Sequence, residues 1–495
     1  MNALQTIDWW AVAAPLVLAV TAVLVLLADA FAGPPRSHRA ALVPSALTLL
    51  GVLVAAVPAV SLWGDPRSTF CIVRPMGGPA PCSFAVDRFT LVFWGVVLFG
   101  TAVVALLGTA AVTEGRTPQG EWNFLLLCSA TGALTIAASR DLVTLVVSLE
   151  VVSLPAFALV GLRRGDARAA EAAVKFFLVS VVSTAVMLMG VSLLYGATGS
   201  VFLDQISAAL SRGVPAHQVA VAATLLTVVG LAFKVAAVPF HMWVPDTYVG
   251  APVAVAAYLS VVSKAAGFVG LMLVLTYGLG PITDVWAPVL AVMAALTMTV
   301  GNVLALWQQH AVRLLAWSSV AQAGYILVPF GAAAAGAQKA LGASMGYLAI
   351  YAFVNLGAFA VAAVVGTRYP RQRLTDYRGL VREEPGAGWP LAFALVALAG
   401  LPPGIVGLLA KVVVFNAAAG PATWLAVVMA ANVVVGVVYY ARWLAELFRP
   451  AETAGGSTYN VPNGVAVAIG MTFTAGLLFS VFPGWLLDPV LAALG

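Results

Sequence analysis

About fourteen apolar runs, separated by short segments rich in charge, proline and glycine, dominate this chain, and each is long enough to cross a membrane as a helix. A lipid-exposed segment must satisfy its own backbone hydrogen bonds, so these runs predict an all-α polytopic membrane protein. No basic residues precede the first run, which we therefore expect to be a retained helix rather than a cleaved signal. The predicted spans cover roughly residues 9–30, 40–62, 87–112, 122–139, 141–161, 168–196, 218–240, 252–279, 285–306, 311–333, 338–366, 390–418, 422–447 and 463–488.

Composition excludes several classes of function. Because 62% of the residues are hydrophobic and only 9% are charged, little of the chain is left for a water-soluble nucleotide-binding, nucleic-acid-binding or redox domain. The three cysteines include no CxxC pair and the four histidines are scattered, so neither an iron–sulfur cluster nor a structural zinc site is expected. We therefore expect a single membrane domain, in contact with the lipid bilayer, that binds no metal, cofactor or nucleic acid itself.

Basic residues in the predicted loops indicate the orientation. Fourteen arginines flank the odd-numbered loops, against five basic residues at the even-numbered ones. Because lysine and arginine are retained on the cytoplasmic side, both termini are predicted to lie outside and the odd-numbered loops inside. Cys71 and Cys82 then share an outside loop, where a disulfide is chemically permitted but not required. The odd-loop arginines are Arg36, Arg39, Arg116, Arg163, Arg164, Arg168, Arg313, Arg368, Arg371, Arg373, Arg378, Arg382, Arg442 and Arg449.

Four of the five lysines lie inside predicted spans, whereas no arginine lies near the centre of one. These lysines are Lys175, Lys234, Lys264 and Lys411, and Glu150 is their acidic counterpart in the fifth span. An ionisable side chain at mid-membrane costs about 2.5–3.5 kcal/mol and is by default a candidate functional residue. Lysine suits proton transfer better than arginine, because a guanidinium cannot be deprotonated. We therefore predict that these five residues translocate protons.

Three of the candidate residues differ in how well an ordinary structural role would explain them. Lys264 lies about twelve residues, roughly 18 Å, into its span, which is too deep for snorkelling to either surface. Lys175 lies only four residues after Glu171, so an ordinary i,i+4 ion pair is an alternative to proton transfer. His241 follows a proline in the seventh span, where it either relays protons or ends a helix.

Two spans are interrupted by proline close to a lysine. Pro239 and Pro245 follow Lys234 in FKVAAVPFHMWVPDTY, and LPPGIVGLLAK ends at Lys411. Such breaks are tolerated at membrane depth where the irregular backbone lines a polar cavity. The broken spans are the seventh and the twelfth, so we predict two five-helix repeats (helices 4–8 and 9–13), inverted because five is odd. The predicted units cover about residues 1–112 (helices 1–3), 122–279 (first repeat), 285–447 (second repeat) and 463–488 (helix 14).

The run FKVAAVPFHMWVPDTYVGAPVAVAAYLSVVSKAAGF closely resembles the signature of the antiporter-like subunits of respiratory complex I. These are related to membrane subunits of cation/proton antiporters and membrane-bound hydrogenases, and fourteen spans with a broken seventh and twelfth helix are that family's architecture. The resemblance implies that Glu150 is the family's fifth-helix glutamate and Lys234 its seventh-helix lysine. It also implies that Lys264 is the central eighth-helix lysine and Lys411 the exit residue of the twelfth helix.

The resemblance implies a function and its rivals. The expected role is a proton-translocating, non-redox subunit of NADH:quinone oxidoreductase in the bacterial plasma (inner) membrane, partnered by other antiporter-like membrane subunits. NADH, FMN, iron–sulfur clusters and quinone are expected on partner subunits. A lysine rather than a glutamate at position 411, the additional Lys175 and an end soon after the last span favour one subunit type within the family. The alternatives are a subunit of a multisubunit sodium/proton antiporter or hydrogenase, and a non-pumping scaffold, against which the retained Glu150 and lysines argue.

Overall fold

The computed structural model describes residues 7–32, 41–72, 80–110, 117–333, 337–450 and 461–492. In these ranges thirteen helices are long and apolar enough to cross a membrane, and two shorter apolar helices flank the predicted break in the twelfth span. The predicted all-α membrane architecture is therefore confirmed. The helices are α1 (Ala13–Ala32), α3 (Val43–Ser61), α4 (Arg88–Gly108), α6 (Gln119–Ala138), α7 (Leu142–Gly161), α8 (Ala167–Thr198), α9 (Leu203–Arg212), α10 (His217–Lys234), α11 (Trp243–Gly250), α12 (Val253–Tyr258), α13 (Lys264–Leu273), α14 (Thr283–Leu306), α15 (Ala311–Gly331), α16 (Ala337–Arg368), α17 (Leu380–Glu383), α18 (Pro385–Ala399), α19 (Ile405–Ala419), α20 (Thr423–Phe448), α21 (Asn463–Val481) and α22 (Gly484–Ala492).

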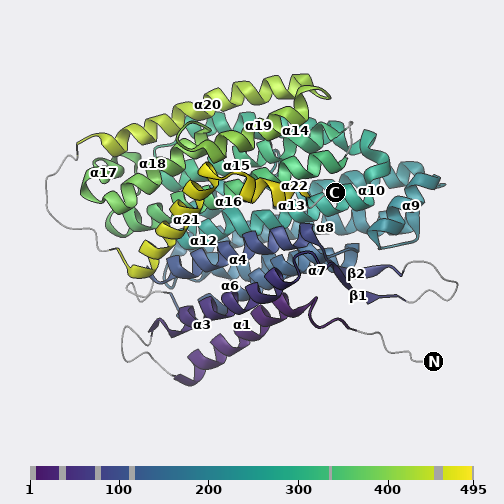
Figure 1. The fold of residues 1–495 in the computed structure, drawn as a ribbon, viewed down its shortest axis with the longest axis horizontal. Coiled ribbons are helices and arrows are strands. Elements are labelled where there is room, and N and C mark those ends of the chain that lie inside the picture. Colours follow the sequence, from purple (N-terminus) through teal and green to yellow (C-terminus); the bar gives the residue numbers. More distant parts are fainter. Residues whose placement is uncertain are drawn as a thin grey trace.

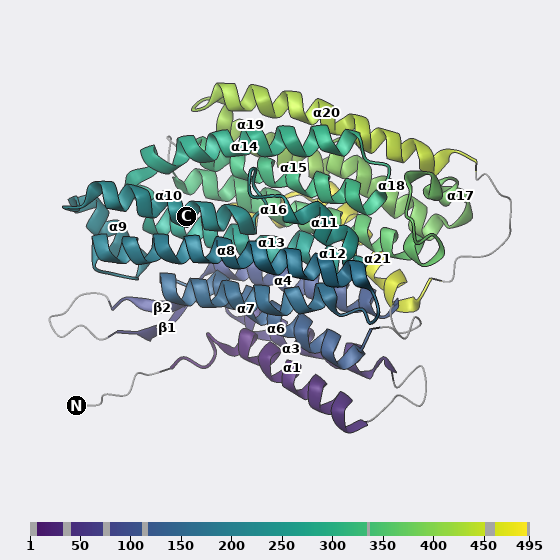
Figure 2. The same ribbon diagram turned by 180° about the vertical axis from the view of Figure 1, so that it is seen from behind.

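The helices run side by side in an elongated bundle, with α20 along one edge and α1 and α3 along the opposite edge (Figures 1 and 2). The long helix α16 packs against α15, α18, α19 and α21. In the first half of the bundle, α6 packs against α7 and α8 against α10. The two breaks fall in the seventh and twelfth spans as predicted, whereas the division into two inverted repeats stays a prediction.

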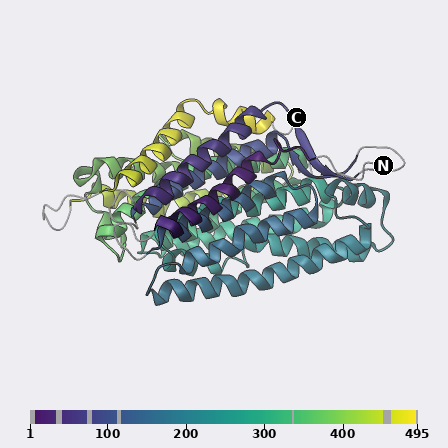
Figure 3. The ribbon, with the colours of Figure 1, turned by 90° about the horizontal axis from the view of Figure 1, so that it is seen from below.

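A two-stranded hairpin, β1 (Arg67–Cys71) and β2 (Cys82–Val86), extends from one end of the bundle. Cys71 and Cys82 face each other across it and form a disulfide, which settles the possibility that the sequence left open. The amide of Asp8, just before α1, donates to Thr69 Oγ1 of the hairpin at 3.0 Å. The last helix, α22, ends on the side of the bundle that carries the hairpin (Figures 1 and 3).

Two segments differ from the prediction. The span predicted at about 463–488 is divided into α21 and α22 at Phe482 and Pro483, because proline cannot continue a helix ladder. Residues Leu203–Arg212, predicted as a loop, form the amphipathic helix α9, which buries Leu203, Ile206 and Leu210. Their i, i+3, i+7 spacing is that of one helical face.

At the first break, side chains accept or donate hydrogen bonds in place of the regular helix ladder. α10 ends at Lys234 and α11 begins at Trp243. The indole of Trp243 donates to the carbonyl oxygen of Phe233 at 3.1 Å, and the amide of Val238 donates to Thr297 Oγ1 at 2.9 Å. Irregular backbone is thus satisfied inside the protein, as membrane depth requires.

Candidate functional site

Glu150 and Lys234 form an ion pair beside the first break. Oε1 of Glu150, on α7, lies 3.5 Å from Nζ of Lys234, whose side chain is 9% exposed. The ammonium also donates to Ser153 Oγ at 2.7 Å and to Ser180 Oγ at 3.1 Å. Glu150 accepts a 2.8 Å hydrogen bond from Thr184 Oγ1. The Glu150 carboxylate and two serine hydroxyls therefore contact the Lys234 ammonium, and Thr184 holds the carboxylate in place.

Lys264 is held by neutral groups. It follows a π-helical turn (Leu259–Ser263) in the eighth span and is only 1% exposed. Its ammonium donates to the carbonyl oxygen of Ser319, on α15, at 2.8 Å, and also to the hydroxyl of Ser319. π-Helical turns inside α-helices are frequent at functional sites. Among the described residues, Ser319 supplies acceptors to this ammonium and no carboxylate pairs with it.

Lys411 caps the helix that ends at the second break. From α19 its ammonium donates to the carbonyl oxygens of Leu398 and Ala399, the last residues of α18, at 2.8 and 2.6 Å. These carbonyls carry the partial negative charge of the helix end. Gly400 has φ +80°, and a Cβ there would lie 2.8 Å from Cδ of Lys411. Glycine at position 400 therefore allows the left-handed backbone turn after α18. It also leaves space for the side chain of Lys411.

Gln322 and Tyr347 form a hydrogen-bonded pair next to Lys411. Tyr347 donates from its hydroxyl to Gln322 Oε1 at 2.5 Å. The amide of Gln322 lies 3.4 Å from the carbonyl oxygen of Leu398, which also accepts from Lys411. All of these groups are buried. Lys411 is therefore joined, through the carbonyl of Leu398, to a polar pair carried by α15 and α16.

A matching pair, Ser319 and Tyr351, adjoins Lys264 on the same two helices. Tyr351 donates from its hydroxyl to Ser319 Oγ at 2.8 Å, and that oxygen also accepts from Lys264. A cavity of about 10 Å³ is lined by Tyr351, Tyr347 and Gln322 of the two pairs, and its remaining wall is apolar, including Ile350 and Val354. This is about the volume that one water molecule needs. Polar groups thus extend from Lys264 to Lys411 with one gap of the size of a water.

Lys175 and His241 lie apart from these groups. Lys175, with a side chain 53% exposed, pairs with Glu171 at 2.7 Å, so the i,i+4 pair considered from the sequence is present. His241 is buried, with its ring 5.5 Å from that of Trp317. Neither shares a hydrogen bond or ion pair with Glu150 or the buried lysines in the described part of the chain. Their assignment to the proton path stays a prediction.

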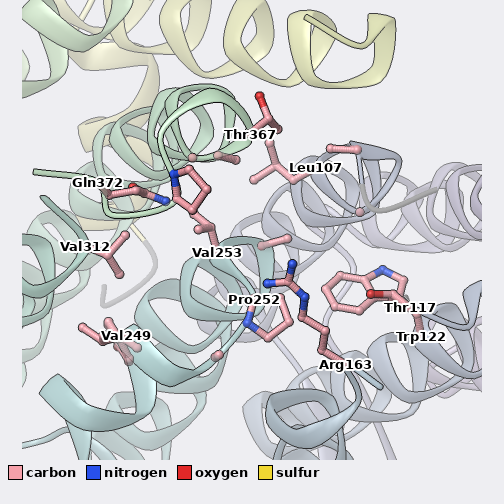
Figure 4. A pocket seen from close by; sticks show the side chains of 18 of the residues that line it. Leu107, Thr117, Trp122, Arg163, Val249, Pro252, Val253, Val312, Thr367 and Gln372 are labelled. Carbon is pink, nitrogen blue, oxygen red and sulfur yellow. The ribbon is translucent and has the colours of Figure 1, made fainter. Parts of the chain in front are cut away.

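A polar cavity of about 250 Å³ (Figure 4) is lined by Leu107 and Gly108, the last residues of α4. The hairpin precedes the first residue of α4, so the cavity lies at the opposite end of the bundle. Arg163, Trp122 and Gln372 come to it from different helices and loops, and Tyr248 of α11 also lines it. His310, just before α15, lies in its wall, and burial together with the charge of Arg313 lowers the pKa of this imidazole. The cavity gives water a place inside the bundle on the side of the arginine-rich loops.

Comparisons with known proteins agree with this architecture. The family described as "NADH:quinone oxidoreductase/Mrp antiporter, TM" matches residues 139–437. NADH-quinone oxidoreductase subunit N 2 of Streptomyces griseus is 51% identical over 503 aligned positions, covering 97% of this chain and 93% of that protein. Subunit N of Salinispora tropica is 45% identical, covering 91% and 88%.

Two solved structures share the fold. A chain of respiratory complex I from Thermus thermophilus with bound aureothin is 31% identical with a TM-score of 0.77, covering 97% of this chain and all of that one. A chain of the Mrp complex from Dietzia has a TM-score of 0.83, covering 98% and 97%, but is 22% identical. The second likeness extends to the fold alone.

Proposed function

The chain belongs to the NADH:quinone oxidoreductase/Mrp antiporter transmembrane family, and from that premise we propose that it is an N-type, proton-translocating subunit of a bacterial NADH:quinone oxidoreductase. The named relatives at 51% and 45% identity support the subunit type, as do the lysine at position 411 and the additional Lys175. Electron transfer and its cofactors belong, in this proposal, to partner subunits. The neighbouring membrane subunits of the complex are the proposed partners.

One observation carries the proposal: three buried lysines each sit where a helix loses its regular form. Lys234 ends α10 at the first break, Lys264 follows a π-helical turn, and Lys411 faces the second break. Irregular backbone at membrane depth exposes polar groups that water and protons can use. A scaffold would have no need for three desolvated ammonium groups, each of which costs stability.

The proposed path runs from the Glu150–Lys234 pair through Lys264 to Lys411. Gly267 supports the first step, because a Cβ there would lie 2.9 Å from Cβ of Lys234. Gly267 and Lys264 are one turn apart on α13, so Lys234 packs close to the face that carries the central lysine. For the second step, the Ser319–Tyr351 and Gln322–Tyr347 pairs and one intervening water are the proposed carriers.

The main alternative is a subunit of a multisubunit sodium/proton antiporter or a membrane-bound hydrogenase. Purifying the native complex from the source membrane and identifying its chains by mass spectrometry tests the choice. We expect the hydrophilic, NADH-oxidising subunits of complex I to copurify. A complex of antiporter subunits only would overturn the assignment.

We also propose that both termini lie outside and that the arginine-rich loops lie inside. The disulfide between Cys71 and Cys82 supports this orientation, because such bonds persist in the oxidising compartment and the hairpin lies at the end where α22 finishes. The described arginines also support it, because they are more numerous at the odd-numbered loops than at the even-numbered loops. Arg36, Arg39, Arg74 and Arg116 lie outside the described residues.

The orientation predicts which tags are accessible. A protease-cleavable tag at the N-terminus is expected to be cut when protease is added to intact spheroplasts. The same tag inserted at Arg371, an exposed residue between α16 and α17, is the matched control and is expected to be cut only after lysis. The reverse pattern would show that the orientation is wrong.

Removing the carboxylate of Glu150 is expected to stop pumping without preventing assembly. Glu150→Ala deletes the counter-charge 3.5 Å from Lys234. In the proposed mechanism, weakening of this ion pair triggers proton release from Lys234, so the variant loses that control. We expect NADH-driven proton pumping to fall by about 100-fold, as for loss of a positioned acid–base group. Pumping is measured in vesicles that contain the purified complex. Glu150→Asp, which keeps the charge, should retain part of the activity, and normal pumping in an assembled Glu150→Ala complex would contradict the role.

A further inference from the structure

Asp246 is the only charged residue of α11, the short helix that follows the first break. Its Oδ2 lies 3.8 Å from Nζ of Lys175, on α8. Its Oδ1 lies 3.9 Å from Nη2 of Arg313, on α15. Because α8 and α15 come from opposite halves of the chain, one carboxylate ties α11 to both halves of the bundle.

The position of α11 bears directly on the proposed proton path. Trp243, its first residue, donates to the carbonyl oxygen of Phe233, next to Lys234, and stacks on Phe176 with ring centroids 4.4 Å apart. Tyr248, further along α11, lines the 250 Å³ cavity at the arginine-rich end. A displacement of α11 therefore changes both the support of Lys234 and the wall of the cavity.

We infer that Asp246 is a positioning residue that holds α11 in place for proton uptake, and that Lys175 serves as its anchor rather than as a proton carrier. The inference rests on the proposed function, since it assigns how the uptake side of that path is held. A carrier must exchange protons with its neighbours, whereas Lys175 is half exposed and contacts Glu171 and Asp246. A residue that only anchors Asp246 needs a positive charge but does not have to exchange protons.

The decisive variants separate charge from proton exchange at Lys175. Arginine keeps a permanent positive charge, so Lys175→Arg is expected to pump within about twofold of wild type, whereas Lys175→Gln loses about two- to fivefold. Asp246→Asn and Arg313→Gln should each show a loss of the same size, the range that half-exposed ion pairs supply. Glu171→Gln is the matched control, because it removes a carboxylate from Lys175 without touching α11, and it is expected to leave pumping unchanged.

A double variant tests whether Lys175 acts through Asp246. Purified complexes are placed in vesicles, checked for assembly on native gels and assayed for NADH-driven acidification. Lys175→Gln combined with Asp246→Asn is expected to pump no worse than the poorer single variant, because both changes break the same contact. Losses that multiply, or a Lys175→Arg complex as impaired as Lys175→Gln, would overturn the inference. A wild-type complex that does not pump, or a Lys264→Ala complex that does, would instead overturn the proposed function.

Discussion

Replacing Lys264 by arginine is expected to stop proton pumping almost as completely as replacing it by alanine. A central carrier must release its proton as well as accept it, and a guanidinium stays charged at any physiological pH. Within the described residues, Lys264 donates to the carbonyl and hydroxyl oxygens of Ser319, and no carboxylate there pairs with it to hold the proton permanently. We expect both variants to pump about 100-fold or more below wild type.

The measurement is NADH-driven acidification of vesicles that contain the assembled complex, with quinone reductase activity recorded in parallel. Lys175→Arg is the matched control, because it makes the same chemical change at a half-exposed position on the uptake side. Full pumping by Lys264→Arg would mean that a fixed positive charge suffices, and the residue would then be structural. A strong loss in Lys264→Arg together with retained pumping in Lys175→Arg would assign proton release to position 264.

The principal residues of the candidate site could be predicted from the sequence because ionisable groups are expensive in a bilayer. A lysine or glutamate in the middle of an apolar run has few structural explanations, so Glu150, Lys234, Lys264 and Lys411 stand out without any knowledge of packing. Lys175 shows the limit of that reasoning. It also lies in an apolar run, but the structure shows the i,i+4 pair with Glu171 that the sequence left as an alternative, and adds Asp246 as a second acidic partner.

The polar pairs between Lys264 and Lys411 could not be predicted in this way. Ser319, Gln322, Tyr347 and Tyr351 are uncharged, and such residues are common in membrane helices that only pack against each other. Their one available signal is spacing, i,i+3 on α15 and i,i+4 on α16, which places each set on one helix face. Which faces of α15 and α16 contact each other depends on how the two helices pack. The spacing of residues within each helix does not predict that packing.

The two segments in which the predicted helices differ from the structure each have a local explanation. The division between α21 and α22 falls at Phe482-Pro483-Gly484, a proline signal of the kind that identified the other two breaks, but no lysine lies beside it. The helix α9 is too short and too polar to register as a span, although its apolar residues follow a helical period. The sequence therefore predicts a break only where proline and an intramembrane lysine occur together.

Replacing Lys411 is expected to block proton release rather than uptake. In the proposed orientation the seventh span runs from outside to inside and the twelfth from inside to outside, so Lys234 and Lys411 sit in oppositely directed halves of the path. Two ammonium groups joined through the buried, low-dielectric interior repel each other, so a proton arriving at Lys264 favours the departure of one from Lys411. Without the ammonium at 411, that departure has no carrier. The complex is expected to bind NADH and quinone but to turn over slowly, with pumping lowered by about 100-fold.

The choice of variant decides whether this test is clean. Lys411→Ala also removes the donor to the carbonyl oxygens of Leu398 and Ala399, so a loss of activity could follow from a disturbed end of α18. Lys411→Gln keeps an N–H donor on a side chain one atom shorter but has no proton to release. In vesicles, proton uptake from the inside and release to the outside are followed separately after a single pulse of NADH. We expect rapid uptake and no release from both variants. Normal release from Lys411→Gln would show that Lys411 only caps α18. Loss of uptake together with intact release from a preloaded path would show that protons move in the opposite direction.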